Sequence, residues 1–117
     1  MSRRTERVAE AIQELVARLL LREIKDPRIG LVTITGVRIS PDLRQARILF
    51  SSLGDADVRA QSLAGLQSAA GFVRSQIARQ LNLRVAPQVR FEFDPSLEQA
   101  ERVLRLLKDP PTEDEQS

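Results

Sequence analysis

The sequence contains no cysteine and no histidine. The lack of cysteine excludes disulfide cross-links and thiol nucleophiles, and the two absences together remove the commonest zinc ligands. A serine nucleophile activated by histidine is excluded as well. Most of the chemistry that small enzymes use is therefore unavailable to this chain. We expect no metal, no cofactor and no small-molecule substrate.

Aromatic residues are also scarce, because there is no tryptophan or tyrosine and there are only four phenylalanines. Phe50, Phe91 and Phe93 alternate with other residues in strand-like segments, which predicts core positions for them. Proteins that bind single-stranded nucleic acid without sequence preference stack bases on exposed aromatic side chains. The composition therefore argues against a general single-strand binder of the RRM or OB type.

Long apolar runs are missing too, since no segment approaches the roughly 20 apolar residues of a membrane-spanning helix. Residues 1–24 are rich in arginine and apolar side chains, as targeting peptides are. Four glutamates interrupt this stretch, at Glu6, Glu10, Glu14 and Glu23. Signal peptides need an unbroken apolar core, and transit peptides are poor in acids. The helical spacing of its apolar residues predicts a folded helix over residues 3–25, in a cytoplasmic protein without membrane contact.

Charge is unevenly distributed along the chain. The formal net charge is +2, from 18 basic and 16 acidic residues, but four acids and no base lie in residues 109–117. Residues 1–108 therefore carry a net charge of +6. A positive domain attracts polyanions such as RNA, although the same charge also promotes solubility. We predict one domain over residues 1–108 and a disordered acidic tail over residues 109–117.

The segment after the first helix predicts a β-hairpin. Residues 31–39 are rich in β-branched side chains, and their apolar face shifts by one residue at Gly36, which predicts a β-bulge. Residues 40–42 have the composition of a turn, and residues 46–51 alternate as a second strand. The two strands should therefore pair antiparallel.

The second half of the chain predicts two helical pieces, a strand and a final helix. One apolar stripe runs through residues 63–81, and Ala69-Ala70-Gly71 in its middle predicts a kink, since glycine costs about 1 kcal/mol relative to alanine in a helix. Residues 88–93 alternate as a strand. Ser96 and Gln99 match a capping box that starts the last helix. The apolar stripe of this helix comprises Leu97, Ala100, Val103, Leu104 and Leu107.

These elements predict an α+β fold in the order helix, strand, strand, helix, kink, helix, strand, helix. A three-stranded sheet packed on one face by helices is the simplest arrangement that buries every apolar stripe, that of the last helix included. A ferredoxin-like fold would begin with a strand, which this chain lacks.

The order of elements matches a type II KH domain, an RNA-binding fold with a Gly-x-x-Gly loop between its two central helices. Here Ala69-Ala70-Gly71 stands in place of that loop, and with this Ala-x-Gly kink the chain resembles the ribosome-binding factor A family. Further motifs of the family follow in order over residues 3–107: Arg4-Thr5-Glu6-Arg7-Val8, Asp26-Pro27-Arg28, Val32-Thr33-Ile34-Thr35-Gly36-Val37, Ser40-Pro41-Asp42-Leu43 with Ala46, Ser52-Leu53-Gly54, Gly71-Phe72-Val73-Arg74, Pro87 with Phe91, and Asp94-Pro95-Ser96-Leu97.

The resemblance implies a ribosome assembly factor that is not an enzyme. The family binds the small ribosomal subunit and its 16S ribosomal RNA late in assembly, supports maturation of the 5′ end of 16S ribosomal RNA, and matters most in the cold. We expect a monomer, and the acidic tail lies outside the resemblance. Two alternatives stay open: a protein interaction module with incidental RNA binding, and an enzyme. The enzyme lacks support, because the sequence has no phosphate-binding glycine loop followed by lysine and no carboxylate cluster at metal spacing.

The candidate RNA-binding residues are arginines. Four of them collect along one flank of the first helix, three project from the open face of the sheet, where Glu92 could pair with one, and Arg74 is placed to cover the kink. The full set is Arg3, Arg4, Arg7, Arg18, Arg22, Arg38, Arg44, Arg47, Arg74, Arg79, Arg84 and Arg90. The alternative is a solvated or internally paired face. An Ala-x-Gly kink exposes less backbone than a Gly-x-x-Gly loop, so we expect contacts to structured RNA and not single-strand reading.

Several other residues have structural interpretations. Ala69 and Gly71 could be small because two helices pack closely at the kink, whether or not RNA binds there. Asp26, Asp42 and Asp94 each neighbour a proline, which favours turn and capping roles over catalysis or metal binding.

Overall fold

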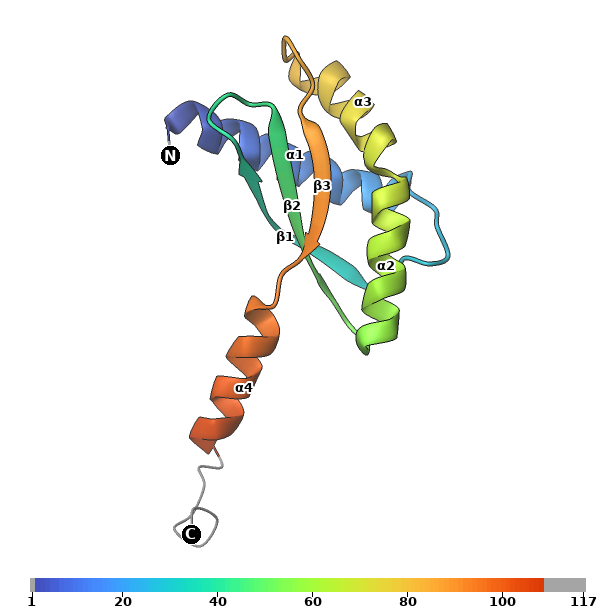
Figure 1. Ribbon diagram of the computed structural model, residues 1–117, viewed down its shortest axis with the longest axis vertical. Helices are drawn as coiled ribbons and strands as arrows, with labels where there is room; N and C mark the ends of the chain where they lie inside the picture. Colours follow the sequence, from blue (N-terminus) through green and yellow to red (C-terminus); the bar gives the residue numbers. More distant parts are fainter. Residues whose placement is uncertain (1, 109–117) are drawn as a thin grey trace, which may run out of the picture.

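The computed structural model describes residues 2–108 of the chain. It contains four helices and three strands in the predicted order (Figure 1). Their bounds are α1 Arg3–Arg22, β1 Val32–Ile39, β2 Gln45–Ser52, α2 Ala56–Ser68, α3 Ala70–Leu81, β3 Gln88–Phe93 and α4 Ser96–Lys108. The acidic tail predicted over residues 109–117 lies outside the described residues.

Helix α1 begins and ends at identifiable caps. The Ser2 hydroxyl accepts a hydrogen bond from the Thr5 N–H at 3.2 Å, which satisfies one of the free donors of the first turn. The helix ends at Arg22, three residues earlier than expected, where the N–H groups of Glu23 and Ile24 both bond the Leu19 carbonyl at 2.8 Å. Its predicted apolar stripe is buried, at Ile12, Leu15, Val16 and Leu19.

The three strands form one sheet in the order β1-β2-β3. β1 and β2 pair antiparallel, as predicted, while β3 pairs parallel to β2 across the α2–α3 connection. The predicted bulge is confirmed: Ile34 pairs with Phe50 and Gly36 with Leu49, so Thr35 is the extra residue. Because this extra residue shifts the pleat by one position, both Ile34 and Ile39 remain buried.

The core lies between one face of the sheet and helices α1 to α3. Phe50 and Phe91 are buried on that face, as predicted, and Leu66 of α2 is fully buried with Val73 and Ile77 of α3. Burying one such side chain contributes about 1.5–3 kcal/mol. The stripe that crosses the kink therefore fixes both α2 and α3 against the sheet.

Helices α2 and α3 meet at a kink at Ala69, as predicted. The N–H of Ala69 bonds the carbonyls of Gly65 at 3.2 Å and Leu66 at 3.0 Å, and its own carbonyl accepts from the Val73 N–H at 2.9 Å. This shared donor tightens the turn between the two helices. The kink is thus a local bend in one nearly continuous helical segment, shorter than a loop.

Two expectations about α4 were wrong. Its apolar stripe is exposed, with Val103 at 54% and Leu107 at 73%, and the helix points away from the sheet (Figure 1). The helix-covered face of the sheet is already filled by α1 to α3, and the opposite face carries charged side chains. The capping box is also absent, because Ser96 lies inside the helix and its N–H bonds the Asp94 carboxylate at 2.9 Å.

Candidate nucleic-acid interface

Three arginines lie side by side on the open face of the sheet. Arg38 of β1 lies opposite Arg47 of β2 in the strand register, and Arg47 lies opposite Arg90 of β3. All three side chains are exposed. Like charges directly opposite one another on adjacent strands are destabilising. The predicted placement on the open face is confirmed. Because the fold gains nothing from this row of positive charge, the row is suited to an external anion.

One acid partly neutralises this row. The Arg47 guanidinium donates two hydrogen bonds to Glu92, at 3.0 Å and 2.7 Å. They hold the pKa of Glu92 below its usual value, and the charges of Arg90 and Arg38 lower it further. Pairing is therefore confirmed for Arg47, while Arg38 and Arg90 have no acid partner within residues 2–108.

A second positive strip follows α1. Its four arginines fall within about 60° of one another at 100° per residue. They are Arg4, Arg7, Arg18 and Arg22, and all are exposed. No acidic side chain of residues 2–108 forms an ion pair with any of them. Internal pairing, the alternative for this flank, is thus not observed, and the side chains are free to contact phosphate.

The kink presents an open surface at the start of α3. Nothing lies within 4 Å of the position that a Cβ would take at Gly71. No side chain caps this helix start, where N–H groups lack acceptors within the helix and carry partial positive charge. Phe72, the next residue, is 40% exposed. The packing interpretation is therefore wrong for Gly71, whose small size leaves the surface accessible.

The loop between α1 and β1 supports the other side of the kink. Arg28 forms a two-point ion pair with Asp26, at 3.1 Å and 2.7 Å, and donates to the Ser68 hydroxyl at 3.0 Å. A Cβ at Gly65 would lie 2.6 Å from Cγ1 of Ile29, so the loop and α2 are in close contact. The Arg28 side chain and N–H lower the pKa of Asp26 to about 2. The turn role predicted for Asp26 is confirmed by the Arg28 N–H, 2.9 Å from its carboxylate.

Arg74 has a different environment from the other candidates. Its side chain is half-buried, and its guanidinium donates to the Ala86 carbonyl at 3.3 Å. Its Nε is buried without a hydrogen-bond partner among the described residues. Arg74 therefore connects α3 to the segment before β3, and RNA contact by this side chain stays a prediction.

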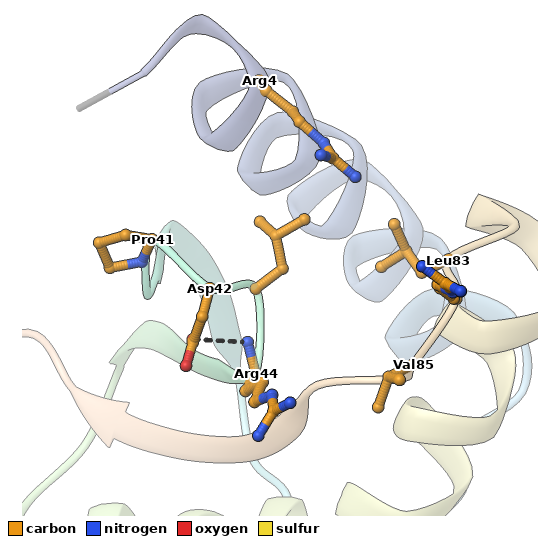
Figure 2. A pocket seen from close by; sticks show the side chains of 8 residues that line it. Arg4, Pro41, Asp42, Arg44, Leu83 and Val85 are labelled. Atoms are coloured by element: carbon orange, nitrogen blue, oxygen red, sulfur yellow. Dashed lines mark hydrogen bonds between the residues drawn. The ribbon is translucent and has the colours of Figure 1, made fainter.

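The remaining candidate arginines, Arg3, Arg44, Arg79 and Arg84, are exposed. Arg44 and Arg84 meet Arg4 around one pocket, where the β1–β2 turn, the α3–β3 loop and the start of α1 come together (Figure 2). The structure thus brings together three side chains that lie far apart in the sequence. RNA contact by this group also stays a prediction.

Sequence reasoning missed two residues of interest. Phe72 was detectable, because at 100° per residue it falls well off the stripe of Val73 and Ile77. Arg59 was not, because its contacts are tertiary: its guanidinium lies 4.3 Å from the ring centre of Phe93 and 3.3 Å from the Glu98 carboxylate. Arg59 holds the start of α4 against β3.

The described residues contain no group of three or more acidic side chains that could hold a metal ion. None of the helices within residues 2–108 is long and apolar enough to cross a membrane.

The fold and this surface define a class of protein. A helix, an antiparallel hairpin, a helix-kink-helix unit and a strand parallel to β2 make a KH-like α+β domain, with an Ala-x-Gly kink in place of the Gly-x-x-Gly loop. Among the described residues, its exposed surface carries unpaired arginines on α1, β1 and β3.

The chain belongs to the ribosome-binding factor A family, whose sequence profile matches residues 4–107. It is 48% identical over 113 residues to the ribosome-binding factor A of Geobacter sulfurreducens, an alignment that covers 97% of this chain and 96% of the relative. The protein of the same name from Desulforamulus reducens is 49% identical and covers 92% of this chain and 89% of its own.

Solved structures agree with this assignment. The solution structure of a Thermotoga maritima protein is similar with a TM-score of 0.71 at 35% identity, covering 79% of this chain and 88% of its own. The crystal structure of ribosome-binding factor A from Thermus thermophilus gives 0.65 at 20% identity and covers 75% and 93%, which shows a shared fold.

Proposed function

We propose that this protein binds the small ribosomal subunit through its 16S ribosomal RNA and acts in the cytoplasm, as a monomer, in late subunit assembly. Support comes from family membership and from a Thermus thermophilus homology model that was fitted into the map of a 30S complex with ribosome-binding factor A. The observation that carries the proposal is the unpaired arginine surface on α1 and the sheet. Such a surface attracts phosphate and gives no other visible advantage to the fold.

The kink supports the same proposal. An uncapped helix start with an open Gly71 allows the close approach of a phosphate backbone, and Phe72 offers an apolar ring beside it. The tight turn at Ala69 leaves no extended loop to clamp a single strand. We therefore expect the kink to contact structured RNA through shape and backbone.

Sedimentation with purified small subunits, large subunits and assembled ribosomes tests the binding proposal. We expect association with the small subunit alone, weakening steeply as salt rises, because counterions are released from phosphates. Joint replacement Arg7→Glu and Arg18→Glu should lower the slope of log affinity against log salt by about two. Arg105→Glu on α4 is the matched control. Absence of the wild-type protein from every ribosomal fraction would contradict the proposal.

The maturation role is tested in cells that lack the gene. The wild-type chain should restore processing of the 16S ribosomal RNA 5′ end and growth in the cold, whereas the Arg7 and Arg18 double reversal should not. Primer extension at low and at optimal temperature measures the unprocessed fraction. Equal rescue by the double reversal would show that the α1 arginines have no part in assembly.

The exposed apolar stripe of α4 favours a second candidate function, a protein interaction module. Apolar docking changes little as salt rises, whereas RNA binding weakens. The same salt series therefore separates the two functions, and salt-independent association would favour the module.

A further inference from the structure

The pocket at the end of the sheet near the start of α1 combines positive charge with an apolar floor. It has a volume of about 350 Å³, and its wall comes from α1, the β1–β2 turn and the α3–β3 loop. Figure 2 shows Arg4 extending from α1, Arg44 on the turn, and Leu83 and Val85 on the loop. We infer that this pocket binds a single nucleotide extruded from structured RNA, with its phosphate between the arginines and its base on the apolar side chains.

The charge of the pocket suits a phosphate. Arg4, Arg44 and Arg84 have no ion-pair partner within residues 2–108. The lining holds a single acid, Asp42, whose Oδ1 accepts hydrogen bonds from the Ser40 hydroxyl at 2.6 Å and from the Arg44 N–H at 3.1 Å. Asp42 remains charged, so three arginines and one acid leave the lining with a net charge of +2. Guanidinium groups recognise phosphate oxygens in a fixed fork geometry. The three arginines stand on three different segments around the rim of the pocket, where their side chains can reach a phosphate held inside it.

The floor of the pocket suits a base. Val85 is 58% exposed, although it is apolar, and Leu83 and Leu43 line the same pocket. Leu43 has a positive φ of 61°, a conformation that costs a residue with a Cβ roughly 1–2 kcal/mol. The hydrogen bonds of Ser40 and Asp42 hold the turn in this shape. Strain of this kind is concentrated at ligand sites, where the surrounding structure maintains it.

The size and shape favour one nucleotide over a longer ligand. A volume of about 350 Å³ lies at the small end of the usual range for ligand pockets. No aromatic side chain lines the pocket, so a stack of successive bases has no platform. The inference rests on the proposed function, because an extruded nucleotide presupposes a structured RNA partner.

Chemical-shift titration of the full-length, isotope-labelled protein tests the pocket directly. The probes are AMP, GMP, CMP and UMP, with ribose 5-phosphate and inorganic phosphate as ligands that lack a base. We expect the nucleotides to shift the backbone amides of residues 42–44 and 83–85 at millimolar concentrations. Arg44→Ala and Arg84→Ala should each weaken nucleotide binding about tenfold. Arg105→Ala on α4, far from the pocket in Figure 1, is the control.

A second variant separates the base from the phosphate. Val85→Ser removes apolar surface from an exposed position, so folding should be unaffected while nucleotide binding weakens and ribose 5-phosphate binding does not change. Equal affinity for ribose 5-phosphate and the nucleotides would overturn the base site. No shift of these amides with any probe would overturn the pocket altogether.

Small-subunit binding by the same variants identifies the source of the nucleotide. If it belongs to RNA, Arg84→Ala and Val85→Ser should both weaken co-sedimentation with the small subunit, while Arg105→Ala should not. Unchanged co-sedimentation of both pocket variants would overturn the inference but leave the proposed function intact. Failure of the wild-type protein to bind small subunits would instead overturn the proposed function.

Discussion

Two helical glycines, six residues apart, should respond to alanine in opposite directions. Gly71 has an unstrained backbone and empty space where a Cβ would lie, whereas a Cβ at Gly65 would come within 2.6 Å of Cγ1 of Ile29 and 3.3 Å of the Asp26 carboxylate carbon. Glycine costs a helix about 0.5–1 kcal/mol relative to alanine. Gly71→Ala should therefore raise the free energy of unfolding by about 0.5–1 kcal/mol.

At Gly65 the clash outweighs the helical preference. Ile29 and Asp26 belong to the loop that Arg28 ties to α2 by its hydrogen bond to the Ser68 hydroxyl, so they cannot move aside freely. Overpacking of this kind typically costs about 1–3 kcal/mol. The net effect of Gly65→Ala should be a loss of about 1–2 kcal/mol, because alanine recovers part of the cost.

Urea titration followed by circular dichroism measures both changes, and the slope of the transition should stay constant. The melting temperature of Gly71→Ala should rise by about 2–5 °C, and that of Gly65→Ala should fall by at least as much. A loss of stability in Gly71→Ala would refute the reasoning, since it would reveal a contact that the structure does not contain.

The larger replacement Gly71→Leu should keep the fold but weaken small-subunit binding. Unchanged binding would show that RNA does not approach the kink.

Three further predictions concern charge and the last helix. Glu92→Gln should release Arg47 and strengthen RNA binding about threefold at low salt, measured by fluorescence anisotropy; weaker binding would contradict the assignment of this face. Arg28→Leu should raise the pKa of Asp26 from about 2 toward its ordinary value of 3.8, measured by carbon-detected NMR titration. Because the folded pKa is depressed, the pair stabilises the wild-type fold above about pH 3.8, and this contribution is lost as the pH falls toward 2. The dependence should be weaker in the variant, which keeps only the hydrogen bond from the backbone N–H of residue 28. A chain that ends at Glu98 should melt within about 2 °C of the full chain, since no residue of α4 is buried; a larger drop would mean that α4 packs on the domain.

Local sequence patterns predicted the helices and strands well, because each strong pattern was consistent with only one kind of secondary structure. The shift of alternation at Gly36 required an extra residue, and the structure places it at Thr35. The position of α4 could not be predicted in this way. Its stripe has the same spacing as a buried helix, and only the assembled domain shows that the covered face of the sheet is full and the other face is charged.

The sequence predicted which residues form the candidate site, but not which of them form ion pairs or lie close together. Sequence alone placed the sheet arginines on the open face, yet it could not decide that Glu92 pairs with Arg47 and leaves Arg38 and Arg90 unpaired. The sequence also could not show that Arg84 and Arg44 line one pocket, because this depends on the path of the α3–β3 loop. Both contacts depend on the tertiary structure, since they involve segments about forty residues apart in the sequence.

The arginines divide into those with a partner in the protein and those without one. Arg28, Arg47 and Arg59 each pair with an acid, and because these pairs are exposed to solvent, each adds little to stability. Their main effect is on where positive charge remains exposed, because they neutralise arginines at the kink loop, at the centre of the sheet and at the start of α4. Most of the unpaired arginines within residues 2–108 then lie on the α1 flank, at both edges of the sheet and around the pocket. Since an arginine that contributes little to folding is free to vary without cost to stability, replacing these residues should affect RNA affinity far more than the melting temperature.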